Sequence, residues 1–556
     1  MAGSSPPSHV SWWTLGALTL GVIGLQYRKE FIRWLFQWLE ETTLESVTSV
    51  DYKEETQANS SAEFIRKHPK GLGKLELLPD IKVLETQLLP IPHLKTFLGE
   101  RSDCHVLNER DIDTTTEHEN IDVGRVSTYN RLMTDSNVIL GDIRRHPTMG
   151  TESRAYLRAG PRKHLYFDPK QVKAAIVTCG GLCPGLNNVI RDITLSLWNL
   201  YGVRTIYGIR GGYGGFFDWK GVSDPIELER KKPLMLTPET VSGIHHLGGT
   251  ILQSNRGGFD VDKILAFVDE FDIAQLYIIG GDGTHRGADK IATEAVKRGL
   301  RLSVAGIPKT IDNDVDLLDR SFGFNTSVEE AQRAIRSAKT EAKCVPNGIG
   351  IVKLMGRSSG FIAAHATLSS GDVNLCLVPE VPIELEGPRG CLPHVERVLK
   401  ERGNAVIVVA EGAGEELLGV CAEKDAGGNK KLPPIGAFLK ERVLEYFQAR
   451  NQTVTVKYID PSYMIRSVEA NAADSLYCML LAQNAVHGAM AGYTGFTVGL
   501  CCNRVVYLPI SAITLNSPRC MDALGRTWER VLCMTRQPNP TYQKPQTGAV
   551  MSNPPL

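Results

Sequence analysis

The sequence carries no excess charge of either sign, because 62 Lys and Arg residues balance 62 Asp and Glu residues. Proteins that bind nucleic acid by electrostatics carry a basic excess, so this balance argues against a nucleic-acid partner. The 12 cysteines include no CxxC pair matched by a second pair of metal ligands, which argues against structural zinc. Their dispersal is typical of free thiols in a reducing compartment. The sequence also lacks a Gly-X-Y period, a short internal repeat and a low-complexity tract.

The N-terminus differs in composition from the rest. Residues 10–25 carry no charge, and Arg28, Lys29 and Arg33 follow them. An apolar run of this length is borderline for a membrane span, and the positive charges after it place the downstream chain on the cytosolic side. The segment FIRWLFQWLEE then puts Trp and Leu on one helical face, as at a membrane interface. We expect residues 10–39 to tether a cytoplasmic body to a membrane; the alternative is a helix packed on the body or on a partner subunit.

The remaining chain has an ordinary globular composition, 42% hydrophobic and 22% charged over 556 residues, which predicts several domains. Short apolar runs alternate with helical segments, which predicts an α/β fold with parallel sheets and ligands beyond the carboxyl ends of the strands. The expected strands are Ala174–Thr178, Arg204–Ile209, Gln275–Ile279, Leu302–Ile307, Gly350–Met355, Leu375–Val378, Ala405–Ala410 and Val454–Tyr458. The expected helices are Leu186–Leu200, Asp260–Phe271, Ala288–Arg298, Val328–Ala342 and Phe361–Leu368.

Glycine pairs concentrate near the expected strand ends. Glycine lets backbone N–H groups approach a phosphate without a Cβ clash, and a helix N-terminus adds a favourable dipole. One pair alone usually marks a tight turn, whereas several in one α/β domain favour polyphosphate binding. Cys179 and Cys183 frame the first pair, where buried thiols are the ordinary interpretation and a metal or redox site is the alternative. The pairs lie at 180–181, 211–212, 214–215, 248–249, 257–258 and 280–281.

Two acidic motifs follow expected strands. In GGDGT, Asp282 lies at the mouth of a glycine-rich loop and suits Mg²⁺, which takes oxygen ligands and shares them with phosphates. In PKTIDND, Thr310, Asp312 and Asp314 crowd one turn, so one acid can be a general base while the other assists it or the metal. A lone DND is normally a loop turn, but the neighbouring GGDG favours a catalytic role.

Three further residues follow expected strands. Arg357, in KLMGRSSG, can bind a phosphoryl group through two parallel hydrogen bonds. Glu411 follows the strand Ala405–Ala410, where an acid can bind sugar hydroxyls, and Arg466 lies in YIDPSYMIR. Taken singly, Glu411 and Arg466 are more typical of surface salt bridges.

Six motifs occur in the order seen in phosphofructokinases: GGLCPGLN, GGYGGFF, GGDGT, PKTIDND, KLMGRSSGF and YIDPSYMIR. Over about residues 95–510 the chain resembles the ATP-dependent 6-phosphofructokinases of plants and trypanosomatids. The resemblance implies two doubly wound, Rossmann-like domains with the active site between them. It also implies transfer of the ATP γ-phosphoryl group to the 1-hydroxyl of fructose 6-phosphate, the committed step of glycolysis, with Mg²⁺ as cofactor and a homotetrameric assembly.

Composition at the two ends of the chain, where the resemblance does not extend, and the resemblance between them give the expected domains. They are an apolar N-terminal segment (1–42), a linker and N-terminal extension (43–165), an ATP-binding domain (166–325), a fructose 6-phosphate-binding domain (326–510), and a C-terminal segment with a disordered tail (511–556).

The motifs carry the family's residue roles to positions of this sequence. Asp312 matches the catalytic base, Thr310 and Asp314 assist it, Arg357 faces the transition state, and Asp282 is the Mg²⁺ ligand. The residues implied to bind the nucleotide are Gly181, Tyr213, Arg256, Gly281, Asp282, Gly283 and Thr284. Those implied to bind the sugar phosphate are Thr310, Ile311, Asp312, Met355, Gly356, Arg357, Glu411, Lys457, Tyr463 and Arg466.

Some positions depart from the family pattern. The first loop reads GGL, with Leu182, where bacterial members commonly have GGD. Gly348 replaces an arginine usually supplied by the neighbouring subunit, so an arginine clamp is not expected there. Arg191 matches one arginine of the bacterial effector site, whereas Leu195 replaces the next.

The phosphoryl donor is open between two molecules. Members that use pyrophosphate typically carry Asp at the position of Gly283, where a side chain blocks the nucleotide. Lys309 is a feature shared with pyrophosphate users. Because ATP-dependent plant and trypanosomatid members carry the same Gly and Lys, we expect ATP.

Other function classes fit less well. NAD kinases and lipid kinases also use GGDGT, but they lack the PKTIDND and MGR segments. A non-catalytic regulatory paralogue is expected to have lost the base or the metal ligand, yet Asp282, Asp312, Asp314 and Arg357 are all present.

Overall fold

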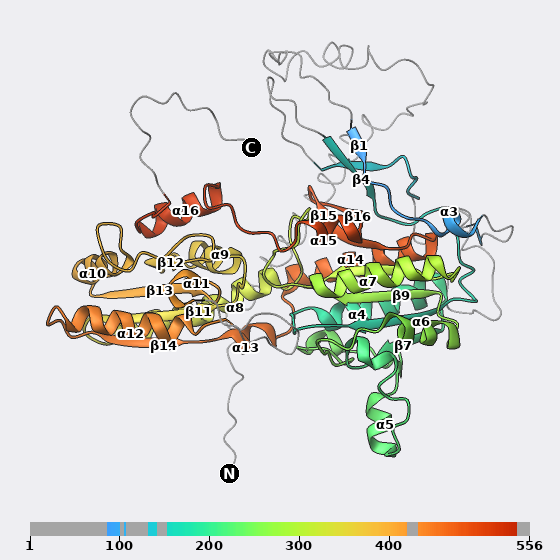
Figure 1. Ribbon diagram of the computed structural model, residues 1–556, viewed down its shortest axis with the longest axis horizontal. Helices are drawn as coiled ribbons and strands as arrows, with labels where there is room; N and C mark the ends of the chain where they lie inside the picture. Colours follow the sequence, from blue (N-terminus) through green and yellow to red (C-terminus); the bar gives the residue numbers. More distant parts are fainter. Residues whose placement is uncertain (1–85, 100–104, 107–131, 142–152, 420–431, 542–556) are drawn as a thin grey trace, which may run out of the picture. The chain divides into compact units, whose positions relative to one another are not determined.

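The computed structural model describes residues 86–99, 105–106, 132–141, 153–419 and 432–541 (Figure 1). They all fall in one structural unit, residues 80–556. The expected membrane-associated segment, residues 10–39, lies outside the described residues. No helix in the described part of the chain is long and apolar enough to cross a bilayer.

The larger sheet has ten strands in the order β1-β4-β16-β15-β10-β9-β6-β7-β8, with β3 paired to β4. Its centre, from β15 to β7, is parallel throughout. All six residues of β9 are buried, as expected for a strand covered on both faces. The strands are β1 (Thr86–Leu88), β3 (Val138–Leu140), β4 (Ser153–Arg158), β6 (Lys173–Thr178), β7 (Thr205–Ile209), β8 (Leu234–Met235), β9 (Gln275–Gly280), β10 (Ser303–Pro308), β15 (Phe496–Cys501) and β16 (Arg504–Pro509). A separate pair joins β2 (His105–Val106) and β5 (His164–Leu165).

Helices cover both faces of this sheet. Side chains alternate along each strand, so Ile176 of β6 packs with α4 and α14, whereas Val177 packs with α6 and α7. This is the doubly wound arrangement that the sequence predicts. The helices and short turns of this half are α3 (Leu94–Leu98), α4 (Leu186–Leu195), η1 (Ser196–Leu200), η2 (Gly212–Phe216), α5 (Pro225–Lys231), η3 (Ile244–His246), α6 (Val261–Glu270), α7 (Asp282–Lys297), α14 (Ala472–Ala491) and α15 (Ile510–Leu515).

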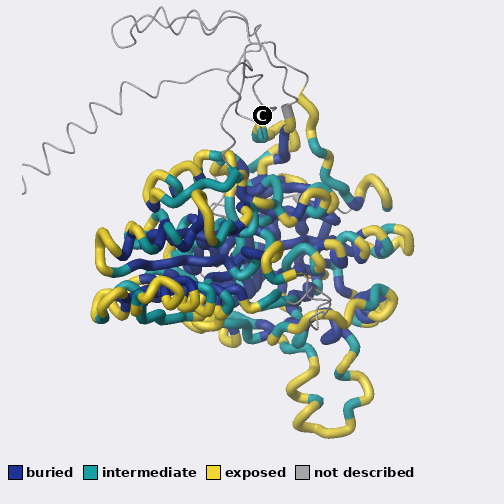
Figure 2. The backbone as a smooth tube through the Cα atoms, turned by 60° about the vertical axis from the view of Figure 1, so that its left-hand side comes forward, coloured by how far each residue is buried: buried dark blue, intermediate teal, exposed yellow. Residues whose placement is uncertain are grey.

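The smaller sheet has four strands, all parallel, in the order β12-β13-β11-β14. Helices α8, α9 and α16 pack on one face, and α10 and α12 pack on the other. Figure 2 shows the buried segments in the interior of the molecule, whereas α5, which buries no residue, projects from it. The elements are β11 (Gly348–Leu354), β12 (Leu375–Leu377), β13 (Asn404–Ala410), β14 (Thr455–Ile459), α8 (Phe324–Lys343), α9 (Phe361–Ser370), α10 (Cys391–Arg402), α11 (Glu415–Leu418), α12 (Ile435–Gln448), α13 (Ser462–Arg466) and α16 (Arg526–Thr535).

The expected α/β class and each expected strand and helix are confirmed, although α7 begins at Asp282 and not at Ala288, so that the GGDGT motif opens the helix. The expected domain limits differ from the structure. Strand β15 pairs in parallel with β10, so residues 496–509 belong to the larger sheet and not to the second domain. Helix α14 is buried on most of its surface because it packs against α4, on the larger sheet. The expected extension also adds β1, β3 and β4 to that sheet.

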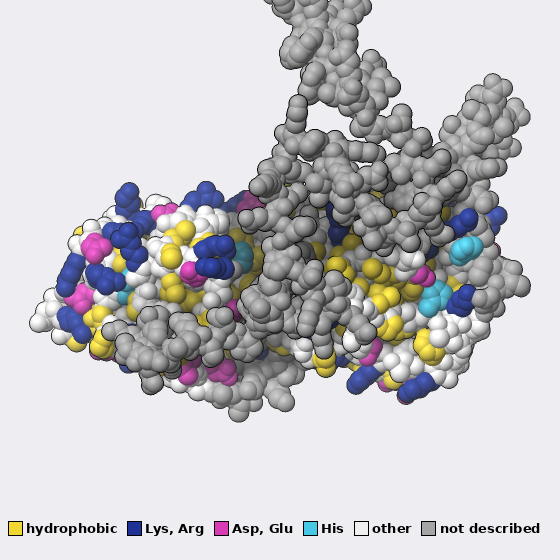
Figure 3. Space-filling view, turned by 90° about the horizontal axis from the view of Figure 1, so that it is seen from above, with side chains coloured by type: hydrophobic (Ala, Val, Ile, Leu, Met, Phe, Trp, Pro, Cys, Tyr) yellow, Lys and Arg dark blue, Asp and Glu magenta, His cyan; other side chains and the backbone are white. Residues whose placement is uncertain are grey.

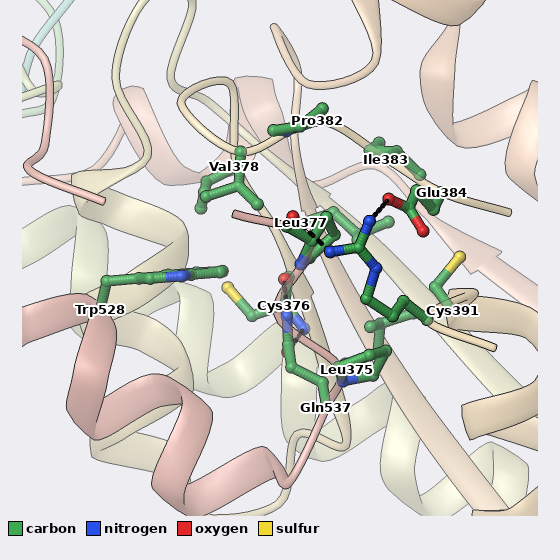
Figure 4. A pocket seen from close by; sticks show the side chains of 14 residues that line it. Leu375, Cys376, Leu377, Val378, Pro382, Ile383, Glu384, Cys391, Trp528 and Gln537 are labelled. Atoms are coloured by element: carbon green, nitrogen blue, oxygen red, sulfur yellow. Dashed lines mark hydrogen bonds and ion pairs between the residues drawn. The ribbon is translucent and has the colours of Figure 1, made fainter. Parts of the chain in front are cut away.

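The C-terminal segment covers the outer strand of the smaller sheet. The side-chain amide of Gln537 accepts from the backbone N–H of Cys376 and donates to its carbonyl oxygen, both at 2.8 Å. Figure 4 shows Gln537 and Trp528 beside Cys376 of β12. Because edge strands expose unpaired backbone groups, these two bonds supply the partner that β12 otherwise lacks. Residues 526–541 are therefore ordered, and only residues 542–556 of the expected tail lie outside the described part.

Charged side chains do not segregate by sign on the face seen in Figure 3, where Lys and Arg lie among Asp and Glu. This mixing matches the balanced composition.

Candidate active site

A cleft of about 710 Å³ lies at the carboxyl ends of strands from both sheets. Its walls come from the segments after β6, β9 and β10 of the larger sheet and after β11 and β13 of the smaller sheet. This is where parallel α/β sheets bind ligands. The predicted site residues that line the cleft are Gly181, Tyr213, Arg256, Gly281, Asp282, Gly283, Thr284, Thr310, Ile311, Asp312, Asp314, Met355, Arg357, Glu411 and Arg466.

The N-terminus of α7 opens into this cleft. Gly281 caps the helix without a side-chain hydrogen bond, so the N–H groups of the first turn remain available to an anion. The hydroxyl of Tyr213 donates to the carbonyl of Thr284 at 2.7 Å, and the Tyr213 ring packs edge-to-face on Phe259. Tyr213 therefore fixes the first turn of α7 from the neighbouring loop.

Gly283 leaves open space beside this turn. A Cβ placed on Gly283 meets no atom within 4 Å, although the residue lines the cleft. A side chain at this position would extend into the cleft and would occupy volume that a bound donor needs.

Positive charge gathers on the opposite side of the glycine loop. Lys309 is buried, and its Nζ donates to the carbonyl of Gly181 at 2.6 Å. A Cβ added to Gly181 would lie 3.6 Å from Arg256 Nη2 and 3.9 Å from Arg466 Nη1. Burial, followed by the charges of Arg256 and Arg466, lowers the pKa of Lys309. Three cations that converge on one glycine loop make a site for a multiply charged anion.

A hydrogen-bonded turn follows β10. The Thr310 hydroxyl accepts from the N–H of Asp312 at 3.1 Å and donates to Asp314 Oδ1 at 2.8 Å. Oδ1 of Asp312 is buried and has no hydrogen-bond partner among the described residues. The turn thus holds the Asp314 carboxylate by a hydrogen bond and leaves one buried oxygen of Asp312 without a partner among the described residues.

The carboxylates of this turn have raised pKa values. Burial first, then the charges of Asp314 and Glu411, raises the pKa of Asp312 to about 8. Burial also raises the pKa of Asp314. Carboxylates with such a shift in a cleft are typical of acid–base sites.

Asp282 fits a magnesium ion that is shared with phosphates. Burial and the charge of Asp314 raise its pKa to about 6, which indicates negative charge that the surroundings do not neutralise. No group of three or more His, Cys, Asp and Glu side chains among the described residues could hold a metal alone. Mg²⁺ commonly binds through one or two carboxylates together with substrate phosphates, so the residues present fit this ion.

The smaller sheet supplies the other wall. Met355 and Arg357 follow β11, and Glu411 follows β13, where its N–H bonds the carbonyl of Leu354 at 2.8 Å. Burial raises the pKa of Glu411, whereas Lys353 and Arg357 lower it. Gly356 has φ +128°, a conformation that other residues rarely adopt, so glycine is required for the chain to turn at this point.

Three predicted sugar-phosphate residues do not line the cleft, namely Gly356, Lys457 and Tyr463. Lys457, within β14, pairs at 3.5 Å with Glu341 of α8, so its side chain points away from the strand end. Tyr463 is 75% exposed on α13, where the Arg466 guanidinium lies 4.8 Å from its ring centre. Of Lys457, Tyr463 and Arg466, only Arg466 lines the cleft.

The structure also bears on the departures from the family pattern. A Cβ on Gly348 would lie 2.0 Å from the carbonyl of Ala342, so a larger side chain does not fit at this position. Arg191 pairs with the adjacent Asp192 at 2.8 Å. Cys179 and Cys183 are buried thiols, and burial raises the pKa of both, as the ordinary interpretation expects.

Sequence reasoning missed several residues of the cleft. Arg286 lies one helical turn after Asp282 and lowers its pKa, so the i, i+4 spacing could have revealed it. Pro518 enters from the C-terminal segment, about two hundred residues after the acidic turn, and no local pattern marks it. Phe259 and Ser358 also line the cleft.

Comparisons with known proteins agree on one family. The family model described as phosphofructokinase matches residues 173–489. ATP-dependent 6-phosphofructokinase 4, chloroplastic, of Arabidopsis thaliana is 51% identical over 391 residues, which are 69% of this chain and 71% of that protein. ATP-dependent 6-phosphofructokinase of Trypanosoma brucei brucei is 45% identical over 376 residues, which are 67% of this chain and 74% of that protein.

A solved structure shares the fold. The crystal structure of a pyrophosphate-dependent phosphofructokinase from Marinobacter aquaeolei aligns with a TM-score of 0.53 and 18% identity, over 66% of this chain and 92% of that chain. At this identity the likeness concerns the fold alone.

Proposed function

The chain belongs to the phosphofructokinase family, and we propose that it transfers the γ-phosphoryl group of ATP to the 1-hydroxyl of fructose 6-phosphate, giving fructose 1,6-bisphosphate. The observation that carries the proposal is the acidic turn: Asp312, whose buried Oδ1 has no hydrogen-bond partner among the described residues, lines a cleft that also holds the open N-terminus of α7. A general base and an anion site in one cleft are what this transfer requires.

Asp312 is the proton acceptor in this scheme. Its carboxylate accepts the hydrogen bond of the attacking 1-hydroxyl and takes the proton as the bond from that oxygen to the γ-phosphorus forms and the bond from this phosphorus to ADP breaks. Thr310 holds the backbone of Asp312 and the carboxylate of Asp314 at once, so the geometry of the turn is set before the substrate arrives.

The remaining residues bind charge. The first turn of α7 and the cations around Gly181 bind the donor phosphates, and Arg357 stabilises the charge on the transferring group. Mg²⁺, when bound at Asp282, supplies further neutralisation of this charge. Met355, Glu411 and Arg466 position the sugar phosphate from the other wall.

ATP is the proposed donor because Gly283 leaves the cleft open at the start of α7. The second candidate is pyrophosphate, which the buried ammonium of Lys309 beside Gly181 favours. Assays with fructose 6-phosphate, with Mg-ATP and Mg-pyrophosphate side by side, distinguish the two. Turnover with ATP alone supports the proposal, whereas turnover with pyrophosphate alone would show that ATP is the wrong donor.

The same assay addresses a non-catalytic regulatory role. The full-length chain in detergent is expected to turn over, because Asp282, Asp312, Asp314 and Arg357 all lie in one cleft. Absence of turnover with either donor would favour the regulatory role.

We further propose that the protein is a homotetramer whose catalytic body lies in the cytoplasm, tethered to a membrane by residues 10–39. The family resemblance supports the tetrameric assembly. The apolar segment and the basic residues that follow it support the membrane tether. Light scattering of the purified protein tests the assembly, and fractionation with and without residues 1–42 tests the tether.

A further inference from the structure

The turn that carries the proposed base is held in an unfavourable backbone conformation. Asn313, between the two acids, has φ 57°, and Leu317 in the same loop has φ 65°. Asparagine tolerates the left-handed region, but leucine is seldom found there. Such residues persist only where surrounding contacts determine their conformation, and they cluster at functional sites.

Arg519 supplies these contacts from the C-terminal segment. Its Nη2 donates to the carbonyl of Asn313 and its Nη1 to the carbonyl of Leu318, both at 3.1 Å. Its backbone N–H donates to the carbonyl of Asp314 at 2.6 Å. One residue therefore fixes three carbonyls of the loop, and the planar guanidinium spans two of them, which an ammonium cannot do in the same geometry.

The same segment also contacts the opposite wall of the cleft. The Arg519 guanidinium lies 5.2 Å from the ring centre of Phe361, the first residue of α9. Cys520 Sγ donates to the carbonyl of Ser358 at 3.3 Å. Residues 519 and 520 therefore touch both the Asp312 turn and the loop that follows Arg357.

A carboxylate completes the link to that second loop. Glu380 accepts from the N–H of Met521 at 2.7 Å and from the N–H of Gly360 at 2.9 Å. Gly360 closes the loop at the start of α9, so the C-terminal segment and the Arg357 loop share one anchoring side chain.

Arg519 is also a buried cation among acids. Burial lowers its pKa, and the carboxylates of Asp316, Asp314 and Asp319 raise it. An arginine remains charged under such conditions, so it offsets the negative charge that collects in this loop. Replacing it removes the side-chain donor of the Asn313 and Leu318 carbonyls and a positive charge that offsets these acids.

We propose that Arg519 is a positioning residue for phosphoryl transfer: it holds the Asp312 turn in its left-handed conformation and aligns it with the Arg357 loop across the cleft. The expected loss of turnover rests on the proposed function. The expected loosening of the Asp312 turn rests only on the contacts of Arg519 described above. Arg519 lies outside the residues that the family model matches, 173–489.

Four variants separate positioning from plain stabilisation. R519M removes the two guanidinium bonds and keeps much of the side-chain volume, whereas R519K keeps the charge but cannot bridge the two carbonyls. Q537L is the structural control, because it removes two hydrogen bonds of the same C-terminal segment at β12. R526M is the matched arginine control, since Arg526 is exposed and pairs only locally with Glu529 among the described residues.

The kinetic test compares kcat and KM in the full-length chain with fructose 6-phosphate and Mg-ATP. A misplaced base loses transition-state stabilisation, so R519M is expected to lower kcat by about 100-fold and R519K by about 10-fold, with KM changed less than about 3-fold. R526M and Q537L keep the wild-type kcat. An R519M kcat within 2-fold of wild type, or a loss matched by Q537L at equal thermal stability, would overturn the proposal.

A second measurement does not depend on turnover. Hydrogen–deuterium exchange of residues 310–320 is expected to rise in R519M and R519K but not in R526M. Unchanged exchange would overturn the positioning role whatever the substrate. If the wild-type chain does not phosphorylate fructose 6-phosphate while exchange rises in R519M, the proposed function fails and the structural role of Arg519 stands.

Discussion

The Thr310 hydroxyl donates a hydrogen bond to Asp314 Oδ1 at 2.8 Å, and its own oxygen, Oγ1, accepts a hydrogen bond from the N–H of Asp312. One hydroxyl thus connects the two acids of the turn and fixes the spacing between them. The bond matters for catalysis because the base must be held close to its productive geometry before the substrate binds.

The first prediction concerns this hydroxyl. T310V keeps the shape of the side chain but removes both hydrogen bonds, so kcat is expected to fall by about 10- to 100-fold. T310S keeps the hydroxyl and is expected to stay within about 5-fold of wild type. Steady-state kinetics of the two variants check this. Equal losses in T310V and T310S would contradict the assignment to the hydrogen bonds, because T310S keeps the hydroxyl.

The second prediction concerns pH. Asp312 accepts a proton only when it is ionised, and burial together with the charge of Asp314 raises its pKa to about 8. The value of kcat/KM should therefore fall as pH decreases through about 8, far above the ordinary aspartate value of ~3.9.

D314N provides the control for this assignment. Its amide oxygen can still accept from Thr310, but the like charge is gone, so the acid limb of the profile is expected to move to lower pH. A limb that stays in place or moves upward would contradict the assignment to Asp312.

The third prediction concerns donor choice. G283D adds a carboxylate to the start of α7, where a Cβ meets no protein atom and the side chain points into the cleft. Folding is expected to be unaffected, and kcat/KM for ATP is expected to fall by about 100-fold or more, because the side chain takes up donor volume and repels phosphate. G283A adds a methyl group without charge, so its kcat/KM for ATP should fall less than that of G283D. Unchanged use of ATP by G283D would refute the steric account.

The fold could be predicted in large part because its strands are continuous apolar runs that end at glycine or acidic motifs. All six residues of β9 are buried, and the run stops at Gly280, where GGDGT begins. The return of β15 to the larger sheet could not be predicted, because strand order depends on contacts between distant segments. For the same reason the sequence predicts that the second domain extends to residue 510, whereas β15 and β16 belong to the larger sheet.

The site divides in the same way. Residues that directly follow strands, such as Asp282, Asp312 and Glu411, lie in the cleft as their motifs predict. Lys457 lies within β14, where alternation of side chains points it toward α8. Arg519 carries no local pattern, since its role depends on a contact with a loop about two hundred residues earlier.

The most direct test of the account is the turnover of D312N with fructose 6-phosphate and Mg-ATP beside that of the wild type. The amide preserves shape but cannot accept the hydroxyl proton, so kcat is expected to fall by about 10²- to 10⁴-fold. ATP affinity, measured by calorimetry, is expected to change little because Asp312 is proposed to act on the sugar hydroxyl and not on the nucleotide. Near-wild-type turnover by D312N would contradict the central claim that Asp312 is the base.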